Sequence, residues 1–157
     1  MVPHDMTETP RHSVSVAAAI FDESGENVLL IKRRDNGHWE PPGGVLELDE
    51  TIEEGLRREV REETGAEIEV GRLTGVYKNI PRGIVALVFQ ATLKTTTFET
   101  SAEATEITWL PVHALPKLMT EAYRVRIADA HRQSPQATIR SHDGVALYGI
   151  DEDAGST

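Results

Sequence analysis

The sequence predicts one α+β domain, in which a mixed β-sheet carries helices on its faces. Apolar, β-branched runs at residues 13–21, 27–33 and 84–93 are typical of buried strands, and an amphipathic helical pattern at 51–64 interrupts their series. A second helical pattern follows the last predicted strand, at residues 116–132. With 157 residues, the chain is long enough for one domain with a substantial hydrophobic core.

The predicted strands lie on both sides of the first helix. The turn-forming segment 22–26 separates residues 13–21 from 27–33, so we expect these two strands to form a hairpin. Residues 84–93 carry the strongest strand pattern and should lie in the centre of the sheet. The remaining strands are expected at 67–77, with a bulge near its glycines, and at 106–110, before Pro111.

The domain is expected to span residues 13–133, with two less regular ends. Residues 1–12 contain two prolines and two histidines without hydrophobic periodicity, which predicts disorder. Residues 134–157 are expected to form a C-terminal tail. Within it, Asp143-Gly144 favours a hairpin turn, and a hairpin over 137–150 could pair two chains as a homodimer, while the last residues should be disordered.

The charge of the chain is concentrated in one segment. The formal net charge is −10, and residues 47–69 contribute −7 through ten acidic residues and three arginines. This acidity excludes a basic nucleic-acid-binding stripe. No apolar run is long enough to span a membrane, and the first residues lack a signal-peptide pattern, so we expect a cytoplasmic protein. The absence of cysteine excludes disulfides and thiolate chemistry.

The predicted helix at 51–64 has recognisable ends. Thr51 followed by Glu54 is a capping-box pattern, and Gly65 is a typical stop. Its first half should form the ion pairs Glu53–Arg57 and Glu54–Arg58. Its apolar face should contain Ile52, Leu56 and Val60.

Three glutamates near the end of this helix are harder to explain as structure. Glu59, Glu62 and Glu63 are three and four residues apart, so they share an arc of about 100° on the helix surface. The helix dipole disfavours negative charge there, and like-charged neighbours cost about 0.2–0.5 kcal/mol per pair. One interpretation is a solvated acidic face. The other is a site for a hard divalent cation such as Mg²⁺, which prefers oxygen ligands.

The residues themselves favour the cation. Gly44, Glu50, Arg58-Glu59, Glu62-Glu63 and Gly65 stand at fixed spacings, and an aliphatic residue follows Glu59. This pattern resembles the Nudix box of the Nudix hydrolases, and the preceding Trp39-Glu40-Pro41-Pro42-Gly43 resembles the lead-in to that box. Ala66 departs from the family pattern, which usually has a larger aliphatic residue at that position.

The resemblance implies an α/β/α sandwich and hydrolysis of a nucleoside diphosphate linked to another group. Glu59, Glu62 and Glu63, with the carbonyl of Gly43, would be ligands of Mg²⁺, for which Mn²⁺ could substitute. Glu59, and next Glu62, would orient or deprotonate the attacking water. Arg58 would hold the glutamates by ion pairing.

Other residues are expected around this centre. Glu50 would be an outer-shell acid that ties the loop to the helix. Gly44, Arg33 and Arg34 are candidates for substrate binding, the arginines through phosphate. Candidates for an additional carboxylate are Glu103 and Glu106, and candidates for stacking on a base are Trp39, Tyr77 and Phe89.

The box leaves the substrate open among ADP-ribose-like compounds, nucleotide sugars and (d)NTPs. A different class of function is also consistent with the fold, namely a nucleotide sensor that binds without cleaving. Such a module would be expected to lose the box glutamates, and this chain keeps them. Gly55, in the middle of the helix, costs about 1 kcal/mol relative to alanine. Close packing of the helix against the sheet would explain it, and an accident of sequence is an equal alternative.

Overall fold

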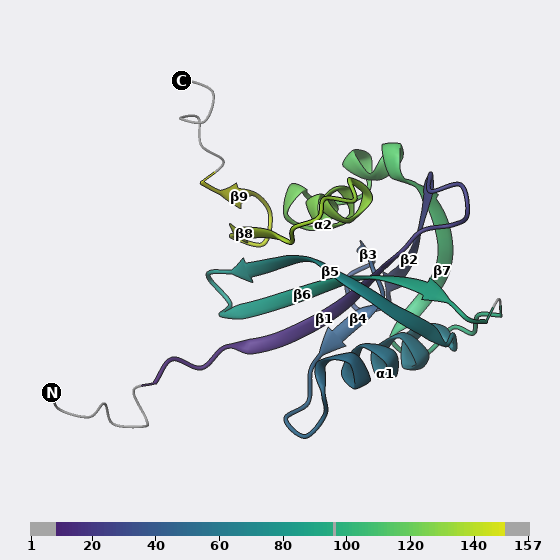
Figure 1. Cartoon of the computed structure of the whole chain (residues 1–157), viewed down its shortest axis with the longest axis horizontal. Helices are drawn as coiled ribbons and strands as arrows, with labels where there is room; N and C mark the ends of the chain where they lie inside the picture. The colour runs from purple at the N-terminus through teal and green to yellow at the C-terminus, as the bar shows by residue number, and fades with distance from the viewer. Residues whose placement is uncertain (1–8, 96, 150–157) are drawn as a thin grey trace, which may run out of the picture.

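The computed structural model describes residues 9–95 and 97–149, and Figure 1 shows the arrangement of its elements. The expected α+β fold is confirmed. The elements, in chain order, are β1 (Ser13–Ile20), β2 (Asn27–Arg33), β3 (Trp39–Glu40), β4 (Gly43–Val45), α1 (Ile52–Thr64), β5 (Ile68–Asn79), β6 (Ile84–Leu93), β7 (Ala104–Pro111), the 3₁₀ helix η2 (Val112–Lys117), α2 (Glu121–His131), β8 (Thr138–His142) and β9 (Leu147–Tyr148).

The strands form two sheets rather than the single sheet expected. The larger sheet has the order β4-β1-β6-β5-β8-β9, and the smaller has the order β3-β2-β7. β1 runs parallel to β6 and β5 runs parallel to β8, while the other pairs are antiparallel. The larger sheet is therefore mixed, and β6 lies in its interior as predicted. The register shifts of β5 between Val70 and Gly75 confirm the predicted bulge.

The predicted hairpin of β1 and β2 is wrong. The two strands belong to different sheets, and only the isolated bridge between Phe21 and Val28 joins them. Both strands are continuous apolar runs that are buried on both faces, so each can lie in the interior of its own sheet. The connecting segment is held instead by Asp22, whose carboxylate accepts hydrogen bonds from Asn27.

The helices cover opposite faces of the sheets, which gives the α/β/α layering (Figure 1). Leu56 and Val60 of α1 are fully buried against Val16 and Ile20 of β1. Ile52, predicted on the same apolar face, is 41% exposed because it stands in the first turn, at the rim of the contact. α2 packs on the other face, where Ala130 meets Ala19, Tyr77 and Val88 in a second cluster.

The second helix is shorter than the predicted 116–132. Pro116 lies inside the 3₁₀ helix η2, and α2 begins only after Thr120, whose extended backbone interrupts the helical run. Leu118, which lies in the interrupted part of the predicted helix, is 41% exposed, whereas Ile127 of α2 is fully buried.

The segment after α2 joins the larger sheet. β8 pairs with β5, and β9 folds back on β8 with Ser141 opposite Tyr148, so the predicted hairpin is present. His142 of β8 is fully buried. Of the segments predicted to be disordered, residues 1–8 and 150–157 lie outside the described residues. In the described part of the chain, no helix has the length and apolar character needed to cross a membrane.

Candidate active site

The predicted ends of α1 are confirmed. The Thr51 hydroxyl accepts a hydrogen bond from the Glu54 N–H at 3.2 Å, and the Glu54 carboxylate accepts one from the Thr51 N–H at 3.0 Å. Gly65 ends the helix with φ of 74°, and its N–H donates to the Arg61 carbonyl. These caps position the glutamates of the last two turns.

The three helix glutamates do not point the same way. Glu59 and Glu63, four residues apart, lie on the inner face and are 9% and 3% exposed. The side chain of Glu62 is 56% exposed. The interpretation as a solvated acidic face therefore fails for two of the three carboxylates.

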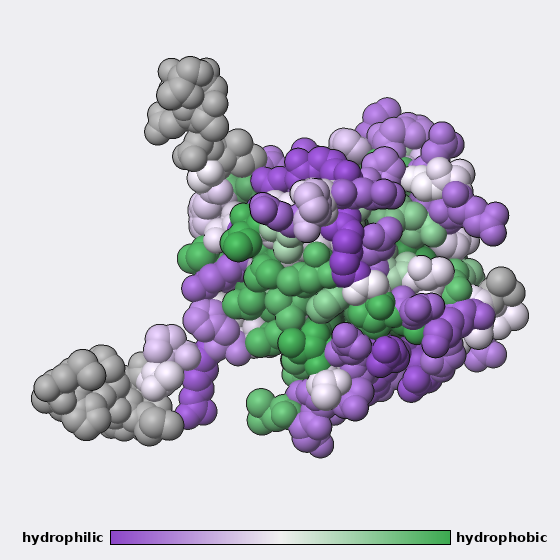
Figure 2. All heavy atoms as spheres, in the orientation of Figure 1, coloured by the Kyte–Doolittle hydropathy of each residue, from purple (hydrophilic) through white to green (hydrophobic). Residues whose placement is uncertain are grey.

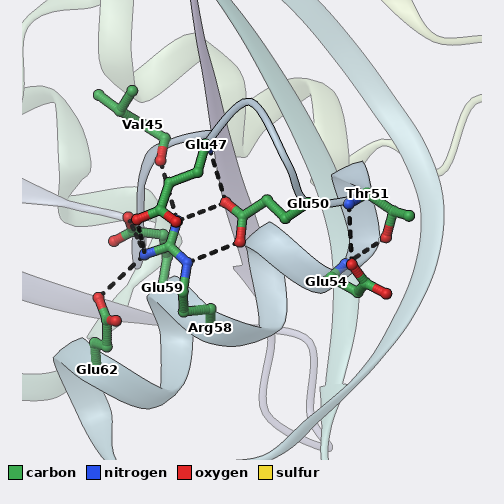
Figure 3. Close-up of polar contacts among 8 residues, drawn as sticks. All are labelled: Val45, Glu47, Glu50, Thr51, Glu54, Arg58, Glu59 and Glu62. Carbon is green, nitrogen blue, oxygen red and sulfur yellow. Dashed lines mark hydrogen bonds and ion pairs between the residues drawn. The ribbon is translucent and has the colours of Figure 1, made fainter.

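Arg58 holds this acidic region together (Figure 3). Its Nε and Nη2 donate to the two carboxylate oxygens of Glu50 at 2.9 and 2.7 Å, and its Nη1 donates to Glu59 at 3.0 Å and Glu62 at 3.2 Å. Nη2 also reaches the Val45 carbonyl at 3.2 Å. The guanidinium thus joins the loop before the helix to both turns that carry acids.

One predicted ion pair is replaced by this arrangement. Glu53 and Arg57 pair as expected, at 3.6 Å. Glu54 and Arg58 do not pair, because Glu54 is committed to the capping box and Arg58 to Glu50. Arg58 pairs with Glu50 because Glu50 presents both carboxylate oxygens to the guanidinium, a geometry that strengthens charge-assisted hydrogen bonds.

Gly43 and Gly44 allow two close approaches, Gly43 to β1 and Gly44 to the Glu59 carboxylate. The Gly43 N–H donates to Glu63 at 2.8 Å, and a β-carbon at Gly43 would lie 2.7 Å from Ala17 Cα. A β-carbon at Gly44 would lie 2.5 Å from Glu59 Cδ and 2.7 Å from its Oε1. Gly44 therefore has a visible structural role, which is to let the strand pass directly beside the Glu59 carboxylate.

Gly55 acts similarly, but toward the loop rather than the sheet. A β-carbon there would contact Leu46 and would lie 2.7 Å from Glu50 Oε1. The expectation that Gly55 packs against the sheet is wrong. The glycine instead admits the loop that carries the Glu50–Arg58 pair.

Burial changes the acidity of the carboxylates. It raises the pKa of Glu63 to about 8, and the nearby charges of Glu59, Glu40 and Glu103 act in the same direction. Burial also raises the pKa of Glu59, although its bond to Arg58 opposes the shift. By contrast, Arg58 and the Glu47 N–H lower the pKa of Glu50 to about 2.

These two acids suit a bound cation. Glu59 and Glu63 offer carboxylate oxygens, the ligands that hard divalent cations prefer. Their pKa is raised mainly because burial disfavours the ionised carboxylate, which a cation would stabilise. Over residues 9–95 and 97–149, no three His, Cys, Asp or Glu side chains are close enough together to hold a metal ion. Glu62 would have to leave Arg58 before it could complete such a group with Glu59 and Glu63.

The two candidates for an additional carboxylate differ in position. The charge of Glu103 acts on both Glu59 and Glu63 and raises the pKa of each. Glu106 lies 3.9 Å from Lys32 in an ion pair on β7. Glu103 is therefore the candidate that faces the acidic centre.

A cleft of about 820 Å³ opens beside Gly43 and Gly44. Ala17, Ile84 and Ala86 of β1 and β6 contribute to its apolar lining. In Figure 2, hydrophobic residues gather in the middle of the visible face, where β1, β4 and β6 lie in Figure 1, and polar residues flank them. A cleft of this volume can hold a nucleotide-sized ligand.

The predicted substrate-binding arginines lie at different places. Arg33 lines the cleft, where its guanidinium binds Asp35 at 2.8 and 2.9 Å and Glu40 at 3.0 Å. Arg34 donates to the Ala102 carbonyl at 2.8 Å and does not line the cleft in the described structure.

Only one of the three candidates for base stacking faces the cleft. Trp39 lines it and also packs on the cluster that contains Val28 and Leu30. Tyr77 is fully buried, and Phe89 packs on the α1 side of the sheet.

The side of the cleft that α2 contributes was not predicted from the sequence. Tyr123 and Arg126, one turn apart, both line the cleft. Arg126 itself was the available signal, because it stands among the positions of Ala122, Ile127 and Ala130, which are buried. A purely structural helix would carry an apolar residue on that side.

Comparison with known proteins identifies relatives of this chain. A model of the NUDIX domain matches residues 11–130. A MutT-like protein from Streptomyces ambofaciens is 51% identical over 145 residues, which cover 92% of this chain and 93% of that protein. An ADP-ribose pyrophosphatase from Methanocaldococcus jannaschii is 37% identical over 111 residues, or 66% of each chain. The crystal structure of a NUDIX hydrolase from Nitrosomonas europaea has a TM-score of 0.72 at 25% identity, covering 84% of this chain and 80% of that one.

Proposed function

The chain belongs to the Nudix family of hydrolases, and we propose that it cleaves the diphosphate linkage of a nucleoside diphosphate derivative with Mg²⁺ as the cation. The observation that carries the proposal is the buried pair Glu59 and Glu63, held by Arg58 and by the Gly43 N–H at the edge of the cleft. Structure alone gives little reason to bury two neighbouring carboxylates.

The site residues have distinct parts in this reaction. Glu59 and Glu63, with Glu62 and the Gly43 carbonyl, would hold the divalent cation. The bound cation supplies charge neutralisation and Lewis acidity toward the diphosphate. Glu59, and next Glu62, is the group expected to take a proton from the attacking water, as the match to the Nudix box implies. Arg58 and Glu50 are positioning residues, since their bonds are to protein groups.

The substrate class rests on the cleft and on the relatives. The cleft of about 820 Å³ adjoins the box glycines, so a nucleotide can lie along it with its diphosphate toward α1. The relative from Methanocaldococcus jannaschii, named as an ADP-ribose pyrophosphatase, supports ADP-ribose as the first compound to test. Nucleotide sugars, NADH and (d)NTPs complete the panel.

The test measures product release from this panel with Mg²⁺, with Mn²⁺ and with chelator. We expect cation-dependent hydrolysis of one compound far above the others. Tight nucleotide binding without turnover would favour a sensor and contradict the proposal.

Two glutamine variants on the same helix then test the assignment of the acids. Glu59→Gln should fold normally and lose about 10²–10⁴-fold in kcat, the range for general-base groups. Glu53→Gln is the matched control, because Glu53 is exposed and pairs only with Arg57 among the described residues. Near-wild-type turnover of Glu59→Gln would show that the acids are assigned wrongly.

A further inference from the structure

Arg126 is the cation that α2 places in the cleft. Its Cζ lies 4.8 Å from the ring centroid of Tyr123 and 5.1 Å from that of Tyr77, distances typical of cation–π contacts. Both rings thus lie close to the guanidinium, and cation–π contacts leave its N–H donors free for hydrogen bonding.

Among the described residues, the N–H donors of Arg126 have almost no hydrogen-bond acceptors. The Nε atom of Arg126 is buried and has no hydrogen-bond partner within residues 9–95 and 97–149. Nη2 lies 3.1 Å from Nε2 of His142, while the other ring nitrogen, Nδ1, accepts from the Gly144 N–H at 3.0 Å. A neutral imidazole has one acceptor nitrogen, so His142 can satisfy Gly144 or Arg126 but not both.

In the part of the chain that the structure describes, no carboxylate forms an ion pair with Arg126. Glu40, which acts on it electrostatically, is bound to Arg33 at 3.0 Å. An unpaired guanidinium at a buried site is costly, and an anion in the cleft would remove this cost.

An anion bound at Arg126 would be a different group from the scissile diphosphate. The acids of the box lie on α1 and Arg126 lies on α2, and these helices cover opposite faces of the sheets (Figure 1). The same cleft runs from Gly43 and Gly44 to Arg126, so one extended ligand can reach both. Arg82 and Lys117 also line this cleft and add positive charge to it.

We infer that Arg126 binds a phosphate group of the substrate other than the two phosphates at the hydrolysed linkage. The inference rests on the proposed function and narrows it, because the substrate is then a nucleoside diphosphate derivative that carries a further phosphate. The guanidinium of Arg126 has adjacent N–H donors, and this geometry matches two phosphate oxygens.

A binding measurement without hydrolysis provides the first test. Inorganic phosphate is titrated into ¹⁵N-labelled protein in the presence of chelator, and the Nε–H resonance of Arg126 is followed by NMR, with Arg126→Lys to assign it. We expect this resonance to shift on saturation. An unchanged Arg126 resonance, with or without shifts of other arginines, would overturn the inference.

A kinetic measurement on matched compounds identifies the anion as part of the substrate. NADPH is compared with NADH, and coenzyme A with dephospho-coenzyme A, because each pair differs by one phosphate. We expect the wild type to favour the phosphorylated member of at least one pair by tenfold or more in kcat/KM, through KM. Arg126→Lys should reduce the preference to near one, and inorganic phosphate should inhibit competitively.

The controls distinguish failure of the inference on Arg126 from failure of the proposed function. Arg124→Lys, on the same helix, should leave both the preference and the stability unchanged, because Arg124 lies outside this cleft. Equal rates within every pair, or phosphate binding that does not compete with substrate, would overturn the inference while leaving the proposed function intact. Absence of hydrolysis of every compound would contradict the proposed function, and the NMR titration would then decide on Arg126 alone.

Discussion

Gly44→Ala tests whether the position of the Glu59 carboxylate controls turnover. The added β-carbon would lie 2.5 Å from Glu59 Cδ, whereas ordinary contacts begin at 3.4 Å, so the carboxylate must move by about 1 Å. Displacements of about 1 Å in a catalytic group can cost about 10²-fold in rate. The bond between Glu59 and Arg58, which is 3.0 Å long and half-buried, would weaken at a cost of about 1 kcal/mol in the free energy of unfolding.

A double-mutant cycle tests whether Gly44→Ala acts through Glu59. The value of kcat is measured for the wild type, Gly44→Ala, Glu59→Gln and the double variant, and urea unfolding confirms that each folds. If Gly44→Ala acts by displacing Glu59, its effect should disappear once Glu59 has lost its charge, so the double variant should match Glu59→Gln. Losses that multiply would refute the reasoning, and so would a Gly44→Ala variant with wild-type kcat.

Two further predictions concern stability and are measured by urea unfolding. Gly55→Ala should lower the free energy of unfolding by about 1–3 kcal/mol, although alanine favours helices, because its β-carbon would contact Leu46 and Glu50; a more stable variant would contradict this. Asp129→Asn should lower it by about 2–3 kcal/mol at pH 7, since buried Asp129 accepts bonds from Arg140 at 2.8 and 2.9 Å and from Tyr77 at 2.8 Å. Burial raises the pKa of Asp129, but these bonds outweigh it and lower the pKa below the usual value. The ionised carboxylate therefore stabilises the fold above about pH 4, and this contribution is lost as the pH falls further. The variant should lose less stability than the wild type between pH 5 and 2, and parallel pH curves would argue against the assignment.

The sequence was most informative where structure depends on neighbours in the chain. The caps of α1 were predictable from Thr51, Glu54 and Gly65, because capping bonds join residues three or four apart. The same holds for the turn at Asp143, whose side chain accepts from two N–H groups just after it. Contacts between residues that are close in the chain can therefore be predicted from short sequence motifs.

Long-range arrangement was predicted less well. The separation of β1 from β2 depends on partners about 70–80 residues away, since β1 lies beside β6 and β2 beside β7. The strands β3 and β4 are two and three residues long, and the two prolines between them and the two glycines of β4 are typical of a loop. Arg58 was expected to pair with Glu54, because the competing bond to Glu50 forms only when the loop folds back over Gly55.

Arg58, beside the box acids, and Arg126, in the cleft, differ in how their N–H donors are used, and this difference distinguishes a positioning residue from a binding residue. Arg58 directs its donors to Glu50, Glu59, Glu62 and the Val45 carbonyl, so a ligand could bind it only by breaking bonds that organise the acids. Arg126 has a buried Nε without a partner among the described residues and shares one imidazole nitrogen with a backbone N–H. A saturated guanidinium fixes the geometry of a site, whereas an unsaturated one in a cleft gains most from a ligand. Loss of Arg58 should therefore lower kcat on every substrate alike, while loss of Arg126 should change which substrate is preferred.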